Sequence, residues 1–142
     1  MSLSLFGLVG RISGRAIMEK AKILLVDDED VFANNMVKLI ARRGHEIETV
    51  QNGEKAIKAL KRTEFDVIVL DTNIAGMKGP ALLKEIKELN PKVEVIILTG
   101  HGFFERSAGD IELGAYEVMM KPVRFEDLFE KIKQAHQKKR LL

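Results

Sequence analysis

The chain has 142 residues, of which 46% are hydrophobic and 31% are charged, a balance typical of one globular domain with a single hydrophobic core. It contains no cysteine, which excludes disulfides and thiolate metal sites, and its apolar runs are too short to cross a bilayer, so we expect no membrane association. The net charge of +2 comes from Arg11 and Arg15, because the 21 remaining basic residues balance the 21 acidic ones, and we therefore expect no direct nucleic-acid binding.

Residues 1–17 differ in composition from the rest of the chain. They are apolar and rich in glycine and serine, and Arg11 and Arg15 follow the apolar stretch. A secretory signal peptide carries its positive charge first, so this order argues against one. We interpret the segment as residues that precede a natural start at Met18, from an upstream start codon or from cloning. An arm that packs on the protein or is exchanged between subunits is the alternative. Residues 18–142 are predicted to form one domain.

Five short, mostly apolar runs alternate with helical patterns along this domain. The predicted strands are Lys22–Val26, Glu46–Val50, Val67–Leu70, Val93–Leu98 and Tyr116–Met120. The predicted helices are Val31–Arg43, Glu54–Arg62, Gly79–Leu89, a weaker one over Phe103–Leu113, and one from Phe125 to about Lys139. We expect Asp30 to cap the first helix and Gly44 to end it.

The alternation of strands and helices predicts an α/β fold with a parallel sheet. Strands that are apolar along nearly their whole length are typical of burial on both faces. Crossovers through helices make neighbouring strands parallel, with right-handed connections. We predict a flavodoxin-like, doubly wound (βα)5 fold with a five-stranded parallel sheet in the order 2-1-3-4-5. The order comes from general knowledge of such folds, because the sequence itself shows only the alternation.

Four of the predicted strands end on residues suited to phosphate chemistry. These residues are Asp27 and Asp28 after the first strand, Asp71 after the third, Thr99 after the fourth, and Lys121-Pro122 after the fifth. Since the carboxyl ends of parallel strands lie at one sheet edge, where such folds bind ligands, we expect these side chains to converge. A single aspartate at a strand end is usually a turn former or a helix cap, but four such ends favour a functional site.

The three aspartates predict a site for a divalent cation. Close carboxylates repel one another, and a hard cation, Mg²⁺ or Mn²⁺, relieves that repulsion through oxygen ligands. With a metal beside it, Asp71 can attack a phosphorus centre and form an acyl phosphate. Lys121 can offset charge on the phosphoryl oxygens, and Thr99 can donate its hydroxyl to one of them.

Other residues at this edge carry weaker signals. Gly100 leaves the site open for a phosphoryl donor to approach. We interpret His101 as a polar loop residue, and control of the access of water or donor is the alternative. The Lys121–Pro122 bond follows a strand directly, and its position leaves cis and trans equally open. A cis bond would aim the lysine back across the sheet edge.

These motifs resemble the receiver domain of bacterial two-component response regulators, of the single-domain type found among chemotaxis regulators. The match runs from about Lys20 to Lys138 and depends on Ile23-Leu-Leu-Val-Asp-Asp-Glu29, Asp66-Val-Ile-Val-Leu-Asp71, Leu98-Thr-Gly100 and Lys121-Pro122. The resemblance implies that Asp71 is the phosphoacceptor. The implied metal ligands are Asp27, Asp28, Asp71 and the backbone carbonyl of Asn73, and the implied phosphoryl contacts are Thr99 and Lys121.

The resemblance also implies partners. The donor would be a phosphohistidine on a sensor histidine kinase or on a histidine phosphotransfer protein. The same site would hydrolyse the aspartyl phosphate slowly, so we do not expect an enzyme in the usual sense. No effector domain is expected after Lys139, so output would pass by conformational change and by binding of a downstream protein target. The expected location is the bacterial cytoplasm.

Two positions depart from the pattern of this family. Receiver domains often carry Met-Pro three and four residues after the acceptor, where this chain has Ile74 and Ala75. They usually carry Tyr or Phe three residues before the lysine as a switch, where this chain has Val118. Tyr116 lies two residues earlier, and the strand period of two would point it to the same side as Val118. Either Tyr116 substitutes as the switch, or signalling uses another surface.

Two functional hypotheses follow from the sequence. The first is a stand-alone response regulator of a phosphorelay, switched by phosphorylation of Asp71. The second is a receiver-shaped interaction or dimerisation module whose phosphorylation is incidental. The complete set of acidic, hydroxyl and amino groups favours the first hypothesis, and a homodimer is compatible with both.

Overall fold

The computed structural model describes residues 19–72, 79–100 and 114–141. The strands are β1 (Lys22–Val26), β2 (Glu46–Val50), β3 (Val67–Asp71), β4 (Glu94–Thr99) and β5 (Glu117–Met120). The helices are α2 (Asp30–Arg42), α3 (Gly53–Arg62), α4 (Gly79–Leu89) and α6 (Phe125–Arg140). The segment 1–17 and the predicted helix over Phe103–Leu113 lie outside the described residues. Within these residues, no helix is both long and apolar enough to cross a membrane.

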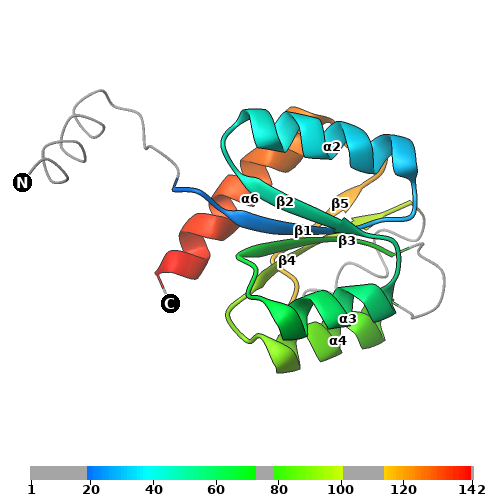
Figure 1. Cartoon of the computed structure of the whole chain (residues 1–142), viewed down its shortest axis with the longest axis vertical. Coiled ribbons are helices and arrows are strands. Elements are labelled where there is room, and N and C mark those ends of the chain that lie inside the picture. The colour runs from blue at the N-terminus through cyan, green and yellow to red at the C-terminus, as the bar shows by residue number, and fades with distance from the viewer. Residues whose placement is uncertain (1–18, 73–78, 101–113, 142) are drawn as a thin grey trace, which may run out of the picture.

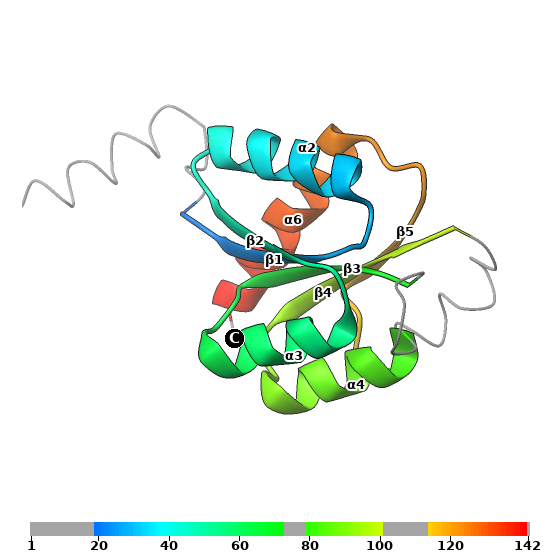
Figure 2. The same ribbon diagram turned by 45° about the vertical axis from the view of Figure 1, so that its right-hand side comes forward.

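The strands form one five-stranded sheet in the order β2-β1-β3-β4-β5, and every neighbouring pair is parallel. This confirms the predicted fold class and strand order. Helices α2 and α6 cover one face of the sheet, and α3 and α4 cover the other (Figures 1 and 2). The chain therefore forms three layers, and the carboxyl ends of all five strands lie along one edge.

The core consists of two apolar clusters, one on each face of the sheet. Alternate residues of β1 supply both, because Leu24 packs toward α3 and α4 whereas Ile23 and Leu25 pack toward α2 and α6. Successive strand side chains point to opposite faces, so a strand that is buried on both sides must be apolar throughout. Burying each of these large side chains contributes about 1.5–3 kcal/mol, and together they fix the sheet that carries the polar strand ends.

The start of α2 differs from the prediction in one detail. Asp30 is the first residue of the helix and not its cap, since the cap position belongs to Glu29, whose side chain makes no capping hydrogen bond. Instead, the backbone N–H of Glu29 donates to Oδ1 of Asp27 at 2.8 Å. Asp27 thus organises the turn and the entry to α2 from two residues upstream. Gly44 follows the helix with a φ of +86°, a conformation that favours glycine, as predicted.

Tyr116 and Val118 do not share a face of the sheet, which corrects the expectation from strand periodicity. Tyr116 precedes the first residue of β5 and packs in the cluster under α2 and α6, where the Nζ atom of Lys138 lies 5.4 Å from the centre of its ring. Val118 is 7% exposed and belongs to the cluster under α3 and α4. The period of two fails because the regular strand begins only at Glu117.

Candidate functional site

The sheet brings the polar strand ends together in register. Asp71 ends β3 opposite Leu98 of β4, and Thr99 ends β4 opposite Met120 of β5. The ladder continues one residue further, because the backbone N–H of Lys121 donates to the carbonyl of Thr99 at 2.9 Å. The backbone of Asp27 is held in the same way by the carbonyl of Val50 at 3.0 Å. The side chains that the sequence predicts to converge therefore start from one rigid edge.

The three aspartates form a candidate metal site. Asp27, Asp28 and Asp71 each offer a carboxylate oxygen within 4.8 Å of the others. Asp27 and Asp71 are 2% and 1% exposed, whereas Asp28 is exposed to solvent. Two acids lie in the floor of the site and one lies at its open side, so the cluster is accessible to an ion.

The environment of Asp27 fits a bound cation. Its Oδ2 atom is buried and has no hydrogen-bond partner among the described residues. Burial raises the pKa of Asp27, and the charge of Asp71 raises it further, against the backbone hydrogen bond from Glu29 and the charge of Lys121. A buried carboxylate oxygen without a donor is costly, and a hard cation with oxygen ligands, such as Mg²⁺, would satisfy it.

Lys121 places a positive charge among the carboxylates of the site. Its Nζ atom donates a hydrogen bond to Oδ2 of Asp71 at 3.1 Å and lies 3.6 Å from Oδ2 of Asp27. Burial alone would lower the pKa of Lys121, but the hydrogen bond to Asp71 and the nearby carboxylates raise it above its ordinary value. The ammonium group is therefore held charged, beside the acid that the sequence predicts to react.

Thr99 and Pro122 adjoin the backbone of Lys121, the first across the sheet and the second in the sequence. Thr99 is fully buried at the end of β4, next to the strand that carries Lys121. The Lys121–Pro122 peptide bond is cis, so the structure has one of the two forms that the sequence left open. Gly100 follows β4 directly. Asn73, Ile74, Ala75 and His101 lie outside the described residues.

Glu29 is a site residue that the sequence analysis missed. Its Oε1 atom lies 3.5 Å from Nζ of Lys121. The Asp-Asp-Glu run was the available signal, but the third acid reads as an ordinary acidic helix entry. Only the position of β5 relative to the end of β1 shows that its carboxylate reaches the lysine.

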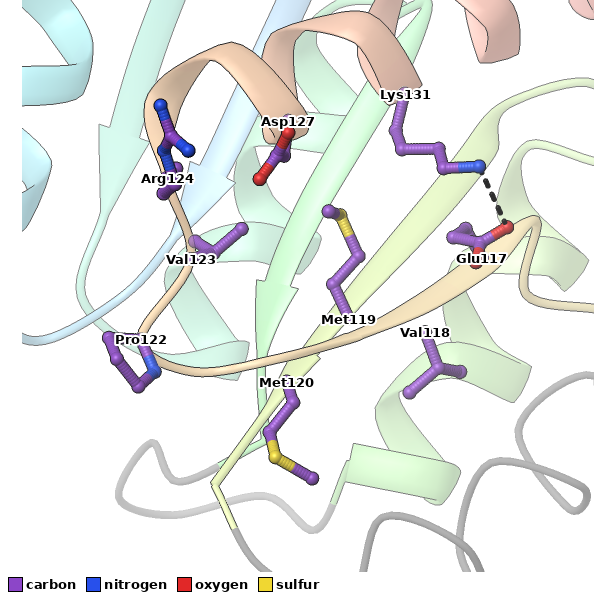
Figure 3. Close-up of a pocket in the computed structure, with 9 residues that line it drawn as sticks. All are labelled: Glu117, Val118, Met119, Met120, Pro122, Val123, Arg124, Asp127 and Lys131. Carbon is purple, nitrogen blue, oxygen red and sulfur yellow. Dashed lines mark ion pairs between the residues drawn. The ribbon is translucent and has the colours of Figure 1, made fainter.

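A pocket lies beside the site, between β5 and α6 (Figure 3). It has a cavity volume of about 380 Å³. Residues of β5, of the connection to α6 and of the first turns of α6 line it, among them Met119 and Met120. Lys131 of α6 pairs with Glu117 of β5 at 3.7 Å across it. Figure 3 shows Met119 directed toward α6 and Val118 directed to the other face. The pocket is therefore continuous with β5, the strand that leads to Lys121.

The sheet order and the acidic site with its lysine define a flavodoxin-like α/β protein with a candidate cation and phosphoryl site. Residues 23–133 match the response regulator receiver domain family. The chain belongs to this family, which acts in two-component signalling.

Individual relatives agree with this assignment. A response regulator receiver domain protein of Clostridium thermocellum has a TM-score of 0.80 and 33% identity, over 85% of this chain and 98% of that one. A CheY-like receiver domain protein of Methanospirillum hungatei has a TM-score of 0.81 and 27% identity, over 86% and 98% of the two chains. The transcriptional regulatory protein ZraR of Escherichia coli strain K12 is 32% identical over 106 residues, 75% of this chain and 24% of that protein. The chain thus spans about a quarter of the length of this curated relative.

Proposed function

We propose that the chain is a phosphorylatable receiver switch whose acceptor is Asp71. The observation that carries this proposal is the position of Asp71: it is buried at a strand end, hydrogen-bonded to Lys121 at 3.1 Å, and grouped with two further carboxylates. The donor would be a phosphohistidine on a sensor histidine kinase or a histidine phosphotransfer protein, in keeping with the family.

The proposed reaction is a direct phosphoryl transfer. A carboxylate oxygen of Asp71 forms a new bond to phosphorus while the phosphorus–nitrogen bond of the phosphohistidine breaks. The electron pair leaves with the imidazole, which regains its basic nitrogen, and the product on this chain is an aspartyl phosphate. Later attack by water would release inorganic phosphate and restore the carboxylate, so this slow hydrolysis is the only turnover that we propose.

Asp27, Asp28, Asp71 and the backbone carbonyl of Asn73 would hold the divalent cation, Mg²⁺ or Mn²⁺. When bound, it supplies positive charge that offsets the negative charge on the transferring phosphoryl group. The buried Oδ2 of Asp27, which no described residue hydrogen-bonds, supports this assignment. Removal of the cation with a chelator would therefore prevent phosphorylation without unfolding the chain, because the apolar core does not depend on it.

Thr99 and Lys121 would contact the phosphoryl oxygens. Lys121 would exchange its hydrogen bond to the free carboxylate for one to a phosphoryl oxygen, and Thr99 would donate its hydroxyl to another. Preorganised donors of this kind favour charge that develops during transfer. Gly100 would keep the approach open. For His101, a polar loop residue stays the prediction, and control of access stays the alternative.

Output would pass through a protein partner that reads a shift between two conformations. The pocket between β5 and α6 supports this proposal, because β5 leads directly to Lys121. Val118 lacks the aromatic ring that is usual at its position, and Tyr116 packs on the opposite face. We therefore propose that signalling uses the surface of β5 and α6 and not an aromatic flip. A stand-alone regulator and a homodimer stay predictions.

The test is phosphorylation by a small-molecule donor. The full chain is incubated with Mg²⁺ and acetyl phosphate, and intact mass is measured over time. We expect one added phosphoryl group on the wild type and none on Asp71→Asn, which keeps the size of the side chain but removes the nucleophilic carboxylate. A folded wild type that gains no phosphoryl group would contradict the proposal and favour the interaction module. An adduct that persists in Asp71→Asn would move the acceptor to another residue.

A further inference from the structure

Glu29 lies at the open side of the site, and the position of its side chain is not explained by capping of α2. It occupies the cap position of α2, where a side chain usually accepts a hydrogen bond from the first turn, yet it makes none. Its carboxylate reaches across to the end of β5 instead, and Oε1 lies 3.5 Å from Nζ of Lys121. The backbone of Glu29 is fixed by Asp27, so this reach is set by the turn itself.

Lys121 is shared among three acids. Its Nζ atom lies 3.1 Å from Asp71, 3.5 Å from Glu29 and 3.6 Å from Asp27. The ammonium group donates a hydrogen bond to Asp71, whereas Glu29 and Asp27 attract it by charge from slightly greater distances. The side chain of Lys121 is 17% exposed, whereas that of Glu29 is 63% exposed. Glu29 is thus the outer partner: its backbone N–H donates to Asp27, and its carboxylate pairs with Lys121.

We propose that Glu29 is a positioning residue that holds Lys121 back from the phosphoryl group. This inference rests on the proposed function of Asp71. Before transfer, Lys121 is divided between the acceptor and Glu29; during transfer, the ammonium group must turn to the phosphoryl oxygens, and the pairing with Glu29 opposes that turn. Loss of the Glu29 charge frees the lysine, so the phosphorylation rate rises.

The size of the effect follows from the exposure of Glu29. Exposed ion pairs are weak because water screens them, and this pair has one largely buried and one exposed partner. We therefore expect Glu29→Gln to speed phosphorylation by about two- to fivefold, a change of rate and not a gain or loss of reactivity. The neighbouring ring of Phe32, whose centre lies 5.4 Å from Nζ of Lys121, keeps the lysine close to the site in the variant.

Asp30 offers a matched control. It carries the same charge on the next residue, and its contact is with Nε2 of Gln51 at 3.5 Å and not with Lys121. Removing either charge weakens the repulsion of an anionic donor to a similar degree. Only the removal of Glu29 frees Lys121, so Asp30→Asn separates the general effect of charge from the specific pairing.

The experiment measures the rate of phosphorylation by acetyl phosphate at saturating Mg²⁺. Samples are quenched at successive times, and their intact mass is determined. Wild type, Glu29→Gln, Asp30→Asn, Lys121→Gln and the double variant Glu29→Gln/Lys121→Gln are compared. We expect acceleration in Glu29→Gln, little change in Asp30→Asn, and no acceleration by Glu29→Gln when Lys121 is already replaced. This loss of effect in the double variant is a coupling that a merely structural role of Glu29 would not produce.

Three outcomes would overturn the inference: equal rates in Glu29→Gln and wild type, equal acceleration in Asp30→Asn, or an acceleration that persists without Lys121. If the wild type reacts with acetyl phosphate and one of these three outcomes is found, the proposed role of Glu29 is wrong, but the acceptor role of Asp71 is unaffected. If the wild type does not react at all, the proposed function itself is wrong.

Discussion

The two carboxylate oxygens of Asp27 lie in different environments. Its Oδ2 atom has no hydrogen-bond partner among the described residues, and burial raises the pKa of the side chain because it disfavours the charged form. Its Oδ1 atom, by contrast, accepts the N–H of Glu29 and holds the turn before α2. One side chain thus combines a structural role with an unmet demand for positive charge.

We expect Asp27→Asn to stabilise the metal-free protein by about 1 kcal/mol, since the amide keeps an oxygen for the Glu29 N–H and removes a buried charge. The same change should abolish the stabilisation that Mg²⁺ gives the wild type, because binding to the folded state alone raises its stability. Urea denaturation at pH 7 with EDTA and with Mg²⁺ measures both effects. A variant that is less stable than wild type in EDTA, or that still responds to Mg²⁺, would refute this account.

Two histidines lie buried at the opposite end of the sheet. Nδ1 of His45 accepts the backbone N–H of Ala21 at 3.0 Å, and Nε2 of His136 lies 3.8 Å from Oδ2 of Asp66. Burial lowers the pKa of His45, and the nearby His136 lowers it further. Burial also lowers the pKa of His136, although the charge of Asp66 opposes this. Both side chains are therefore neutral in the folded protein at pH 7.

A histidine with a lowered pKa in the folded state makes stability fall in acid. The unfolded chain takes up protons first as the pH drops through about 6.5, so stability is complete above that value and declines until the folded-state pKa is passed. We expect a lower free energy of unfolding at pH 5.5 than at pH 7.5, measured with urea. His136→Gln should reduce this pH dependence even if it lowers stability at both pH values. An unchanged dependence would show that other groups cause it.

At the scale of elements, α6 is held at both of its ends by contacts with other elements. Near its start, Phe125 and Phe129 stack with ring centres 5.4 Å apart, and Arg43 after α2 lies over both rings. Near its end, Nζ of Lys139 contacts Oδ1 of Asp66 at 2.6 Å, just before β3. The helix that lines the pocket beside β5 is thus fixed by contacts outside that pocket.

Removal of the Lys139 amino group should therefore weaken the docking of α6. Lys139→Met leaves one oxygen of the partly buried Asp66 without its charged donor, and we expect a loss of about 1–2 kcal/mol in the free energy of unfolding. Lys58→Met is the control, because its pair with Glu54 is exposed, and surface pairs contribute little. Equal effects of the two substitutions, by urea or thermal denaturation, would argue against a structural role for Lys139.

The sequence predicts elements well where a signal is local. Largely apolar strands and amphipathic helices predicted the sheet, and the polar residues at four strand ends predicted the site, since strand ends share an edge in any parallel sheet. Three details escaped because they depend on contacts between elements. Asp30 is not the cap because Asp27 organises the turn, Tyr116 leaves the strand pattern, and Glu29 meets Lys121 only once β1 and β5 are placed.

At the scale of the whole molecule, a phosphoryl group on Asp71 should change the dynamics of the surface along β5. With Mg²⁺ and beryllium fluoride as a phosphate mimic, we expect altered hydrogen exchange in peptides that span Glu117–Arg124, which line the pocket. Peptides from α3, on the opposite face from α6, should change less. Asp71→Asn is the control and should show no response. Uniform exchange with and without the mimic would indicate a module that does not switch.

Every group that we assign to the reaction within the described residues lies at or just beyond a strand end, and none lies in the body of a helix. The outward surfaces of the helices are consequently not constrained by the chemistry. Recognition of a donor or a target can change by substitution on those surfaces while the reacting edge stays the same. An engineer could thus redirect this domain to a different partner without redesigning its reactivity.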